Sequence, residues 1–358
     1  MDSLVEFNYI NQKDKSLVKI FTSSNTTIKR YILGINKFTK SILKHIQVDG
    51  VIDDFTRIQS SNKKDILNIK DIPKNSIILW VSMGSPLEVK NELDKMKFKN
   101  ISYLALYRYS SFDLIEPPFI TDFENDFKKN ITSYKQIYNL LEDTLSKKIF
   151  IKILNFKISF DYTFMEGFVN DHDKQYFDKH IIKNIKNITF LDGGAYTGDT
   201  TPQVITRFPD FKKIFLIEPS LLHINIAKRN LKHISNLEFI NCGLGANKMI
   251  IDESELIKNN CDHNYQTKNI DTIDNIINEN IDFIKLDIEG AEQDAIDGAK
   301  HTILKYKPIL AICIYHKAQD WYKIPQKILL INKDYKVYIR HYMEGIYETV
   351  MYFIPKRY

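Results

Sequence analysis

The sequence predicts an α/β protein with two Rossmann-like domains, of which the C-terminal one has a mostly parallel sheet that ends in an antiparallel hairpin. Three observations support this fold class. From residue 187 onward, short apolar runs alternate with helical stretches, which is typical of parallel βαβ units. A smaller version of the same alternation fills residues 28–110. Near the end, Lys336–Tyr342 and Tyr347–Ile354 are joined by the tight turn Met343-Glu344-Gly345 and are therefore expected to pair antiparallel.

The composition is that of a soluble globular protein long enough for two domains. The chain has 358 residues, of which 44% are hydrophobic and 27% are charged. The net charge of +5 is small for this length and no nucleic-acid-binding motif accompanies it, so we expect no nucleic-acid partner. The three cysteines form no CxxC pair, the first residues contain no apolar leader, and the apolar runs are too short for a membrane span. We therefore expect a cytoplasmic protein.

Residues 1–115 are predicted to form the small N-terminal domain. Its strands are expected at Arg30–Leu33, Val48–Ile52, Ile77–Ser82 and Ile101–Leu106, with helices at Lys37–Ile46 and Leu87–Met96. The turn Gly34-Ile-Asn36 opens the first helix, and Asp53-Asp54 follows the second strand. This arrangement resembles the small Rossmann-like domains of sugar-modifying enzymes, which implies a place for a nucleotide sugar. The loop has one glycine, so a purely structural domain is the alternative.

Residues 116–180 are predicted to be a partly helical connector that also covers the active site. Pro117-Pro118 breaks the regular pattern, and Ile131–Ser146 has the spacing of a helix. Phe150–Phe160 is interpreted as an extended pair or hairpin.

Residues 181–358 are predicted to form the C-terminal domain. Its parallel strands are expected at Ile188–Asp192, Lys213–Glu218, Leu237–Asn241, Ile281–Asp287 and Pro308–Tyr315. The intervening helices are expected to begin near Asp199, Ser220 and Ala291, and a last helix at Gln319–Asn332 precedes the hairpin.

A glycine-containing loop follows the first of these strands. Glycines at such a place let the backbone approach a ligand closely, because a β-carbon would collide with it. Glu218 ends the next strand, where an acid can accept hydrogen bonds from ribose hydroxyls. The alternative is that the glycines only turn a strand into a helix. The predicted cofactor residues are Asp192, Gly193, Gly194, Ala195, Tyr196, Thr197, Gly198, Asp199, Glu218 and Asn241.

The charges beside this loop favour S-adenosylmethionine over a dinucleotide. A pyrophosphate binds to the N–H groups of a helix start and is repelled by anions. Here Asp192 and Asp199 bracket the loop, which suits the ammonium and sulfonium of S-adenosylmethionine. Tyr196 also occupies the position where the dinucleotide fingerprint has its middle glycine.

A second group of acids lies at the end of the strand Ile281–Asp287, where open α/β sheets bind ligands. The predicted catalytic residues are Asp287, Glu289 and His316, with His316 as general base and Asp287 as the rival base. Glu292 is interpreted as an acid that favours the first turn of the next helix. No metal is predicted, although Mg²⁺ held by Asp287, Glu289 and His316 is an alternative. Arg340-His341-Tyr342 is a candidate contact for an acidic substrate, or else a polar strand end.

These motifs together resemble the FkbM family of methyltransferases. The likeness covers roughly residues 187–355 and rests on Leu191-Asp-Gly-Gly-Ala-Tyr-Thr-Gly-Asp199, Ile217-Glu-Pro219 and Phe283-Ile-Lys-Leu-Asp-Ile-Glu-Gly-Ala-Glu292. The resemblance implies a class I methyltransferase fold and O-methylation of hydroxyls on polyketides or on sugars of glycans. It also implies that Asp192, Gly194 and Gly198 line the cofactor, that Glu218 holds its ribose, and that Asp287 and Glu289 face the reaction centre. One departure is Asn241, because many methyltransferases have an acid near the adenine at this point.

The sequence therefore predicts an S-adenosylmethionine-dependent O-methyltransferase, most simply one that methylates a sugar hydroxyl in glycan or polysaccharide biosynthesis. Two alternatives stay open: an NAD(P)-dependent sugar oxidoreductase, and a non-catalytic protein that binds a nucleotide or a carbohydrate. The acids at Asp287 and Glu289 favour catalysis over binding alone.

Overall fold

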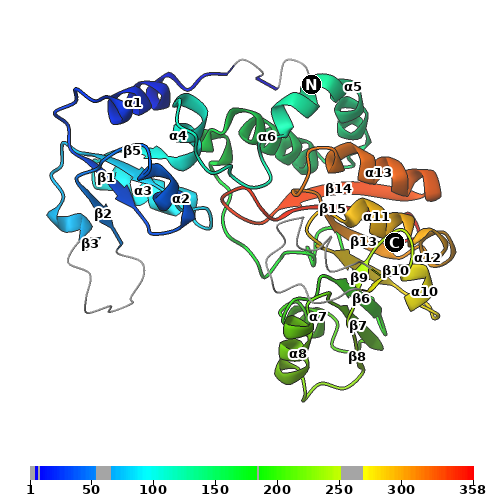
Figure 1. Cartoon of the computed structure of the whole chain (residues 1–358). Helices are drawn as coiled ribbons and strands as arrows, with labels where there is room; N and C mark the ends of the chain where they lie inside the picture. The colour runs from blue at the N-terminus through cyan, green and yellow to red at the C-terminus, as the bar shows by residue number, and fades with distance from the viewer. Residues whose placement is uncertain (1–4, 7–8, 54–65, 184, 251–268) are drawn as a thin grey trace. The chain divides into compact units, whose positions relative to one another are not determined.

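The computed structural model describes residues 5–6, 9–53, 66–183, 185–250 and 269–358. Within it the chain forms two compact units (Figure 1). The first unit consists of Met1–Asn125, Ile151–Asn170 and Met343–Tyr347, and the second consists of Asp126–Phe150, Asp171–Tyr342 and Glu348–Tyr358. The stretch 116–180, which the sequence suggested as a connector, is thus divided between both units.

The first unit contains a parallel five-stranded sheet in the order β3-β2-β1-β4-β5. The strands β1 and β4 are buried along most of their length, which explains why they read as apolar runs rather than as alternating ones. Its elements are α1 (Gln12–Thr22), β1 (Arg30–Leu33), α2 (Lys37–Ile42), β2 (Gly50–Ile52), β3 (Ile66–Leu67), η1 (Ile69–Asp71), β4 (Ile77–Trp80), α3 (Pro86–Lys95), β5 (Lys99–Ser102), α4 (Tyr103–Tyr109) and η2 (Tyr162–Met165).

The strand predicted at Ile101–Leu106 was wrong beyond Ser102. The Ser102 side chain accepts a hydrogen bond from the backbone N–H of Ala105 and so caps α4, which begins at the next residue. The predicted acid pair after β2 includes Asp54, which lies outside the described residues.

Two helices fill the region around the predicted connector, namely α5 (Phe123–Leu140) and α6 (Thr144–Ser159). The hairpin interpreted at Phe150–Phe160 was wrong, because most of this segment belongs to α6. Its side chains are buried on more than one face, from Phe150 through Lys157. A helix buried all round loses the one-sided apolar stripe that identifies helices in a sequence.

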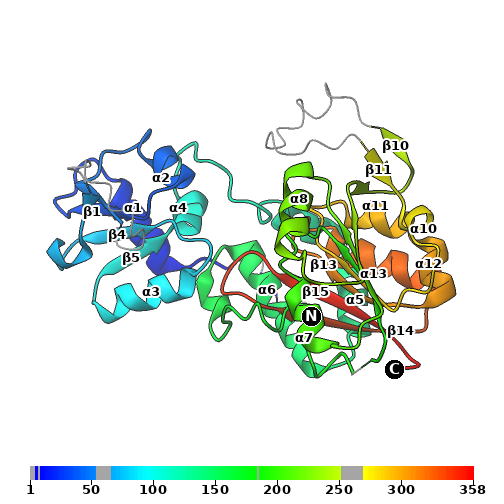
Figure 2. The same ribbon diagram turned by 90° about the horizontal axis from the view of Figure 1, so that it is seen from below.

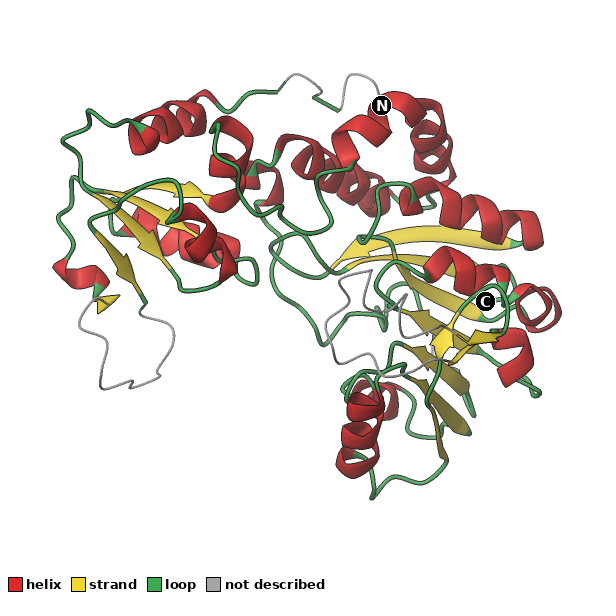
Figure 3. Cartoon of the chain, in the orientation of Figure 1, coloured by secondary structure: helices red, strands yellow, loops and turns green. Residues whose placement is uncertain are grey.

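The second unit contains a seven-stranded sheet flanked by helices (Figure 3). Its remaining elements are β6 (Thr189–Gly193), α7 (Thr201–Arg207), β7 (Lys213–Ile217), α8 (Leu221–Asn230), β8 (Leu237–Ile240), β9 (Gly243–Leu244), β10 (Met249–Ile250), β11 (Asn269–Asp271), α10 (Ile273–Ile276), β12 (Phe283–Leu286), α11 (Glu292–Asp297), α12 (Lys300–Tyr306), β13 (Ile309–Cys313), α13 (Asp320–Ile331), β14 (Tyr335–His341) and β15 (Thr349–Pro355). Helices α11 and α12 both contact α13, and they lie side by side in two views (Figures 1 and 2).

The strand order of this sheet is β14-β15-β13-β12-β6-β7-β8. The five strands from β13 to β8 run parallel, while β15 pairs antiparallel with both β13 and β14. The predicted mostly parallel sheet with a terminal antiparallel hairpin is therefore confirmed. Along the chain, β7 and β8 are added in turn on one side of β6. The chain then returns, and β12 pairs with the other side of β6. The carboxyl ends of β6 and β12 consequently form the switch point at which open α/β sheets bind ligands.

A small three-stranded sheet of β10, β11 and β9 accompanies the large one. Residues 251–268, which connect β10 to β11 and include Cys261, lie outside the described residues. Cys242 and Cys313 are buried free thiols. In the part of the chain that the structure describes, no helix has the length and apolar character required to cross a bilayer.

Candidate active site

The loop after β6 packs directly on the end of β12. These two strands are parallel neighbours, and their register places Gly193 opposite Leu286. Gly194 has a φ of +78°, and a β-carbon there would come within 1.9 Å of the carbonyl oxygen of Asp287. Glycine alone tolerates both the left-handed backbone and this close approach. The contact between two strand ends therefore requires the glycine at position 194.

The first amides of this loop are hydrogen-bonded within the protein. Gly194 and Ala195 both donate to the carbonyl oxygen of Ile217, each at 3.0 Å. The N–H of Tyr196 donates to Oε2 of Glu218 at 2.9 Å. These three N–H groups are thus directed at protein acceptors.

Glu218 directly follows β7 and is 5% exposed. Besides Tyr196, its carboxylate accepts the backbone N–H of Ser220 at 2.8 Å. The Asn241 side chain donates to the carbonyl oxygens of Glu218 and Pro219, both at 2.9 Å, and so fixes the turn that carries the acid. Each carboxylate oxygen of Glu218 has more than one lone-pair direction and retains room for a further donor.

Asp192 is paired with Lys285, which was not among the predicted site residues. The β6–β12 register sets Lys285 opposite Asp192, and the Lys285 ammonium lies 2.8 Å from Oδ1 of Asp192. Lys285 also donates to the carbonyl oxygen of Gly194 at 2.9 Å. Burial opposes the charge of Lys285, but the negative charges of Asp192 and Asp287 outweigh it and raise the pKa of Lys285. The charge of Asp192 is therefore balanced within the protein.

Of the other predicted loop residues, Tyr196 and Asp199 are exposed, Thr197 is half-buried and Gly198 is buried. Tyr196 is exposed, and its ring meets the His223 ring edge-on with the centroids 4.4 Å apart. A hollow of about 530 Å³ lies between the loop, α7 and α8, and it is lined by Thr197, Gly198, Asp199, Pro202, Ile205, Asn230, Leu231, His233 and Ile234. Neither Glu218 nor Asp287 lines this hollow, so it is separate from the point where the strand ends converge.

Asp287, the first residue after β12, is held by two tyrosines. Tyr176 donates to Oδ2 at 2.8 Å, and Tyr315 donates to Oδ1 at 3.0 Å. Tyr176 is brought there by its neighbour Phe177, whose ring packs against those of Phe190 and Phe283 on the two central strands. Burial, together with the nearby charge of Asp287, raises the pKa of both tyrosines, which keeps them as donors.

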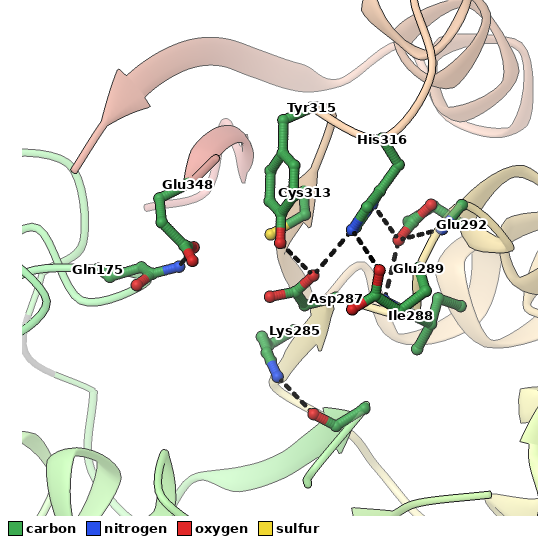
Figure 4. A network of polar contacts seen from close by, with 12 residues as sticks. Gln175, Lys285, Asp287, Ile288, Glu289, Glu292, Cys313, Tyr315, His316 and Glu348 are labelled. Carbon is green, nitrogen blue, oxygen red and sulfur yellow. Dashed lines mark hydrogen bonds and ion pairs between the residues drawn. The ribbon is translucent and has the colours of Figure 1, made fainter. Parts of the chain in front are cut away.

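His316 lies just beyond β13 and is 5% exposed. Its Nε2 atom is 3.5 Å from Oδ1 of Asp287 and 3.6 Å from Oε2 of Glu289, while its Nδ1 atom is 3.1 Å from Oε1 of Glu292 (Figure 4). Burial alone would lower the pKa of His316, but the hydrogen bond and charge of Glu292, with the charges of Asp287 and Glu289, raise it above its ordinary value. The structure thus brings all three predicted catalytic residues together.

The three predicted catalytic side chains differ in exposure. The Glu289 side chain is 64% exposed, whereas that of Asp287 is 20% and that of His316 is 1% exposed. Glu289 also has a φ of +55°, a strained conformation for a residue with a β-carbon. Glu289 therefore lies at the open edge of the cluster, and His316 lies at its floor.

A further acid, Glu348, faces the same cluster from the turn between β14 and β15. Gln175 donates a hydrogen bond to its carboxylate (Figure 4). Burial and the charge of Asp287 raise the pKa of Glu348 to about 7. Among the described residues, two sets have possible metal-ligating atoms within 4.8 Å of one another: Asp287, Glu292 and His316, and Asp287, Cys313 and Glu348.

Arg340, a sequence candidate for contact with an acidic substrate, is instead engaged within the second unit. Its guanidinium lies 2.7 Å from Asp143 and 3.2 Å from Asp178, and it donates to the Ser146 hydroxyl at 2.8 Å. His341 is likewise buried, with Nδ1 2.9 Å from the Thr349 hydroxyl. These polar side chains brace the terminal hairpin.

Several residues of the site were not predicted. Lys285 and Tyr315 stand next to recognised motif positions, so strand register is the signal that could have identified them. Glu292 was predicted only to favour the first turn of the helix that it begins. Tyr176 lies outside the motifs, and nothing in the local sequence indicates its contact with Asp287.

A parallel sheet in this order, finished by an antiparallel hairpin and with acids after β7 and β12, is the fold of class I methyltransferases. Comparison with family models agrees, because residues 192–337 match the family described as Methyltransferase FkbM domain. This part of the chain therefore matches the FkbM methyltransferase domain, as its motifs predicted.

A solved structure with the same fold covers nearly the whole chain. A crystal structure of Methyltransferase FkbM from Methylobacillus flagellatus KT matches 96% of this chain and 94% of its own, with 19% identity and a TM-score of 0.75. An rRNA methylase from Streptococcus thermophilus has 13% identity and a TM-score of 0.33, over 48% of this chain and 89% of its own. Aeropyrum pernix fibrillarin, solved with bound S-adenosyl-L-methionine, has 12% identity and a TM-score of 0.32, over 48% of this chain and 69% of its own. No curated protein matches the chain.

Proposed function

We propose that the protein is an S-adenosylmethionine-dependent O-methyltransferase that methylates a sugar hydroxyl in glycan or polysaccharide biosynthesis. One observation carries this proposal. His316 and Asp287 follow the neighbouring strands β13 and β12 and meet beside the glycine loop of β6. A histidine base therefore lies at the switch point of the sheet, where a cofactor and an acceptor meet.

The residues of the second unit fit the proposed cofactor. Glu218 is a buried acid with capacity for two ribose hydroxyls, and Gly194 brings the loop backbone onto the strand ends. A pyrophosphate would instead need unengaged loop amides. The amides of Gly194, Ala195 and Tyr196 already have protein acceptors, which disfavours a dinucleotide. The proposed cofactor residues remain Asp192, Gly193, Gly194, Ala195, Tyr196, Thr197, Gly198, Asp199, Glu218 and Asn241.

The pairing of Asp192 with Lys285 changes the role that we propose for this acid. Because Asp192 is fully buried and holds Lys285, we assign it to orienting the loop through the bond from Lys285 to Gly194. The negative charge toward a cationic cofactor then comes from Asp199, Glu218 and Asp287.

When bound, S-adenosylmethionine supplies an activated methyl group on sulfur. The chain's own residues then align the acceptor and remove its proton. Alignment of reacting groups is worth about 7–11 kcal/mol in favourable cases. Nε2 of His316 would take the proton of the acceptor hydroxyl, which adds roughly 10²–10⁴ in rate. Asp287, fixed by its two tyrosines, orients the acceptor and stabilises the protonated histidine.

The charges around His316 favour an acceptor that is a neutral polyol at the reacting position. Asp287, Glu289 and Glu348 supply carboxylates, which accept hydrogen bonds from hydroxyl groups and repel phosphates or carboxylates. Two lysines nearby are engaged, since Lys285 binds Asp192 and Lys317 donates to the carbonyl oxygen of Gly290. A sugar hydroxyl meets these requirements.

The proposal is tested by methyl transfer in vitro. The purified protein is incubated with methyl-labelled S-adenosylmethionine and a panel of neutral sugars, sugar nucleotides and cell-surface glycans, and the products are examined for a gain of one methyl group. We expect transfer to oxygen by the wild type and a much slower transfer by His316→Gln. Transfer only to nitrogen or carbon would refute the O-methyl assignment.

Cofactor binding separates the competing functions. Calorimetry should detect binding of S-adenosylmethionine and of its demethylated product but not of NAD or NADP. Tight binding of a dinucleotide alone would support the sugar oxidoreductase instead. Binding of S-adenosylmethionine without transfer to any acceptor, together with retained carbohydrate binding, would support the non-catalytic alternative.

We further propose that the first unit binds the nucleotide part of a nucleotide sugar. A hollow of about 540 Å³ lies at the carboxyl ends of β1 to β3 and against α3, where parallel sheets bind ligands. Leu33, Asp53, Asn68, Lys70 and Glu92 are among the residues that line it. Ligand-detected NMR with a nucleoside diphosphate tests this, and the absence of binding would favour a structural domain. The free thiols Cys242 and Cys313 support a cytoplasmic location.

A further inference from the structure

Glu292 joins the loop after β12 to His316. It is the first residue of α11, and its side chain is fully buried. Its Oε1 atom accepts the backbone N–H groups of Ile288 at 2.9 Å and Gly290 at 3.4 Å. The same oxygen lies 3.1 Å from Nδ1 of His316 (Figure 4). One buried carboxylate therefore contacts the loop that carries Asp287 and Glu289, as well as the proposed base.

A role in helix stability alone does not explain this placement. A carboxylate that favours a helix start does so from the surface, facing the first turn of its own helix. Glu292 is instead withdrawn from water and faces a residue 24 positions later in the chain. A buried carboxylate is costly unless charged or polar partners compensate it, and His316 is its one titratable partner at hydrogen-bonding distance among the described residues.

We propose that Glu292 is a positioning residue that, with His316, forms a carboxylate–imidazole dyad. Glu292 holds the proton of His316 on Nδ1, so that Nε2 faces the acceptor as the base. This inference deepens the proposed function and rests on it for its catalytic consequence, but the proton position itself does not depend on any reaction.

The two ring nitrogens have different surroundings, and this difference sets their roles. The hydrogen bond made by one imidazole nitrogen decides which tautomer the neutral ring adopts. Nδ1 faces Glu292, whereas Nε2 faces Asp287 and Glu289 at the open edge of the cluster. After Nε2 accepts the hydroxyl proton, Glu292 stabilises the resulting cation across the ring. The proton then leaves to solvent past the exposed Glu289.

Other charged and titratable groups also surround His316 and contribute to its protonation. Besides Asp287, Glu289 and Glu292, they are Tyr315, Lys317, Asp320 and Glu348. Among these, Glu292 is the acid whose carboxylate lies 3.1 Å from Nδ1, so its replacement is expected to change the tautomer as well as the pKa.

The first experiment measures the proton position without cofactor or substrate. In protein with ¹⁵N-labelled histidine, the His316 signals are assigned by comparison with His316→Gln. We expect the neutral ring of the wild type to carry its proton on Nδ1. A neutral ring protonated on Nε2 would overturn the proposal, and this result requires no variant of Glu292 to fold.

The second experiment uses Glu292→Gln, which keeps an oxygen for the two loop amides but removes the charge. We expect the pKa of His316 to fall and the Nδ1 proton to be lost in part, with Glu292→Asp restoring the higher pKa. In the same variants, the pH of half-maximal kcat/KM should move downward with the pKa of His316, and the plateau should fall by about tenfold to a thousandfold. A loss of rate without a shift of the pH profile would indicate a merely structural role.

Glu279→Gln is the matched control. Glu279 pairs with Lys212 and Lys213 at the amino end of β7, on the opposite edge of the sheet. We expect no change in the His316 titration or in the pH profile for this variant. If the tautomer and pKa behave as expected but the wild type transfers no methyl group, the proposed function fails while the dyad stands. An unchanged titration in Glu292→Gln removes the dyad whatever the reaction.

Discussion

Gly194 and Asp287 meet backbone to backbone at the switch point of the sheet. A β-carbon on Gly194 would lie 1.9 Å from the carbonyl oxygen of Asp287, far inside contact distance. Through this contact, the loop that carries the predicted cofactor residues rests directly on the strand that carries the predicted catalytic ones. The separation between the predicted cofactor residues and the predicted catalytic residues is therefore set by main-chain packing rather than by side chains.

This contact predicts that Gly194→Ala is strongly destabilising. The substitution adds left-handed strain of about 1–3 kcal/mol and forces the two strand ends apart. We expect a loss of about 3 kcal/mol or more in the free energy of unfolding, measured with urea, and a weaker affinity for S-adenosylmethionine by calorimetry.

Two other glycines serve as controls that separate the cost of a left-handed backbone from the cost of a steric clash. Gly167 has a φ of +88° with nothing within 4 Å of its would-be β-carbon, and Gly84 has open space and no left-handed φ. Gly167→Ala should therefore cost only the strain, and Gly84→Ala should be close to neutral. Equal losses for Gly194→Ala and Gly167→Ala would show that the contact with Asp287 contributes nothing.

The buried pair of Lys285 and Asp192 predicts a large effect when one partner is removed. Both side chains are almost completely buried, so Lys285→Met leaves Asp192 with an uncompensated charge. We expect a loss of about 3–5 kcal/mol in stability by urea unfolding. The double variant Lys285→Met with Asp192→Asn should recover part of it.

The exposed pair of Lys90 and Asp94 is the comparison for this prediction. Its side chains are 27% and 40% exposed, so Lys90→Met should cost only about 0–1 kcal/mol. Similar losses for the two methionine variants would contradict the view that Lys285 balances Asp192.

Asp320 predicts a pH-dependent stability. Asp320 is buried at the start of α13, and burial raises its pKa from 3.8 to about 7. The folded state therefore binds a proton that the unfolded state releases, so stability falls as the pH rises from about 4 to 7. At about 1.4 kcal/mol per pKa unit, the loss is on the order of 2–4 kcal/mol. Asp320→Asn should flatten this dependence, measured by urea unfolding at several pH values.

The Asp320→Asn variant keeps an acceptor for Gln293, whose side chain donates to Oδ1 of Asp320 at 2.7 Å. Asp294→Asn changes an exposed acid on the neighbouring α11 and should leave the wild-type dependence intact. An Asp320→Asn curve as steep as that of the wild type would assign the pH dependence to other groups.

Asp287→Asn tests whether the acid at the end of β12 takes part in turnover. One tyrosine hydroxyl keeps its acceptor in the amide oxygen and the other becomes the acceptor of the amide N–H, but the charge that stabilises protonated His316 is lost. We expect kcat to fall by about 10²-fold, with binding of S-adenosylmethionine retained in calorimetry. Turnover like that of the wild type would remove Asp287 from the mechanism.

Much of the second unit could be predicted because its signals are local. Buried parallel strands read as apolar runs, and the acids and glycines that follow them mark the carboxyl ends of the sheet. The strand that ends at Asp192 and the one that ends beside Glu218 were therefore located to within a residue or two. The same signals failed for α6, whose buried Lys157 and surrounding apolar residues do not show a one-sided helical pattern.

The sequence by itself determined which segments form the strands of the large sheet in the second unit, the terminal hairpin, and which acids, glycines and histidine lie at strand ends. Each of these depends on residues that are neighbours in the chain, so a local pattern of periodicity and turn residues predicts it. Only the tertiary structure decided how charges pair. Asp192 meets Lys285 because β6 and β12 are in register, Asp287 meets Tyr176 because Phe177 packs on the central strands, and Glu292 meets His316 across α11 and β13. Such contacts depend on packing between distant segments, which no local pattern records.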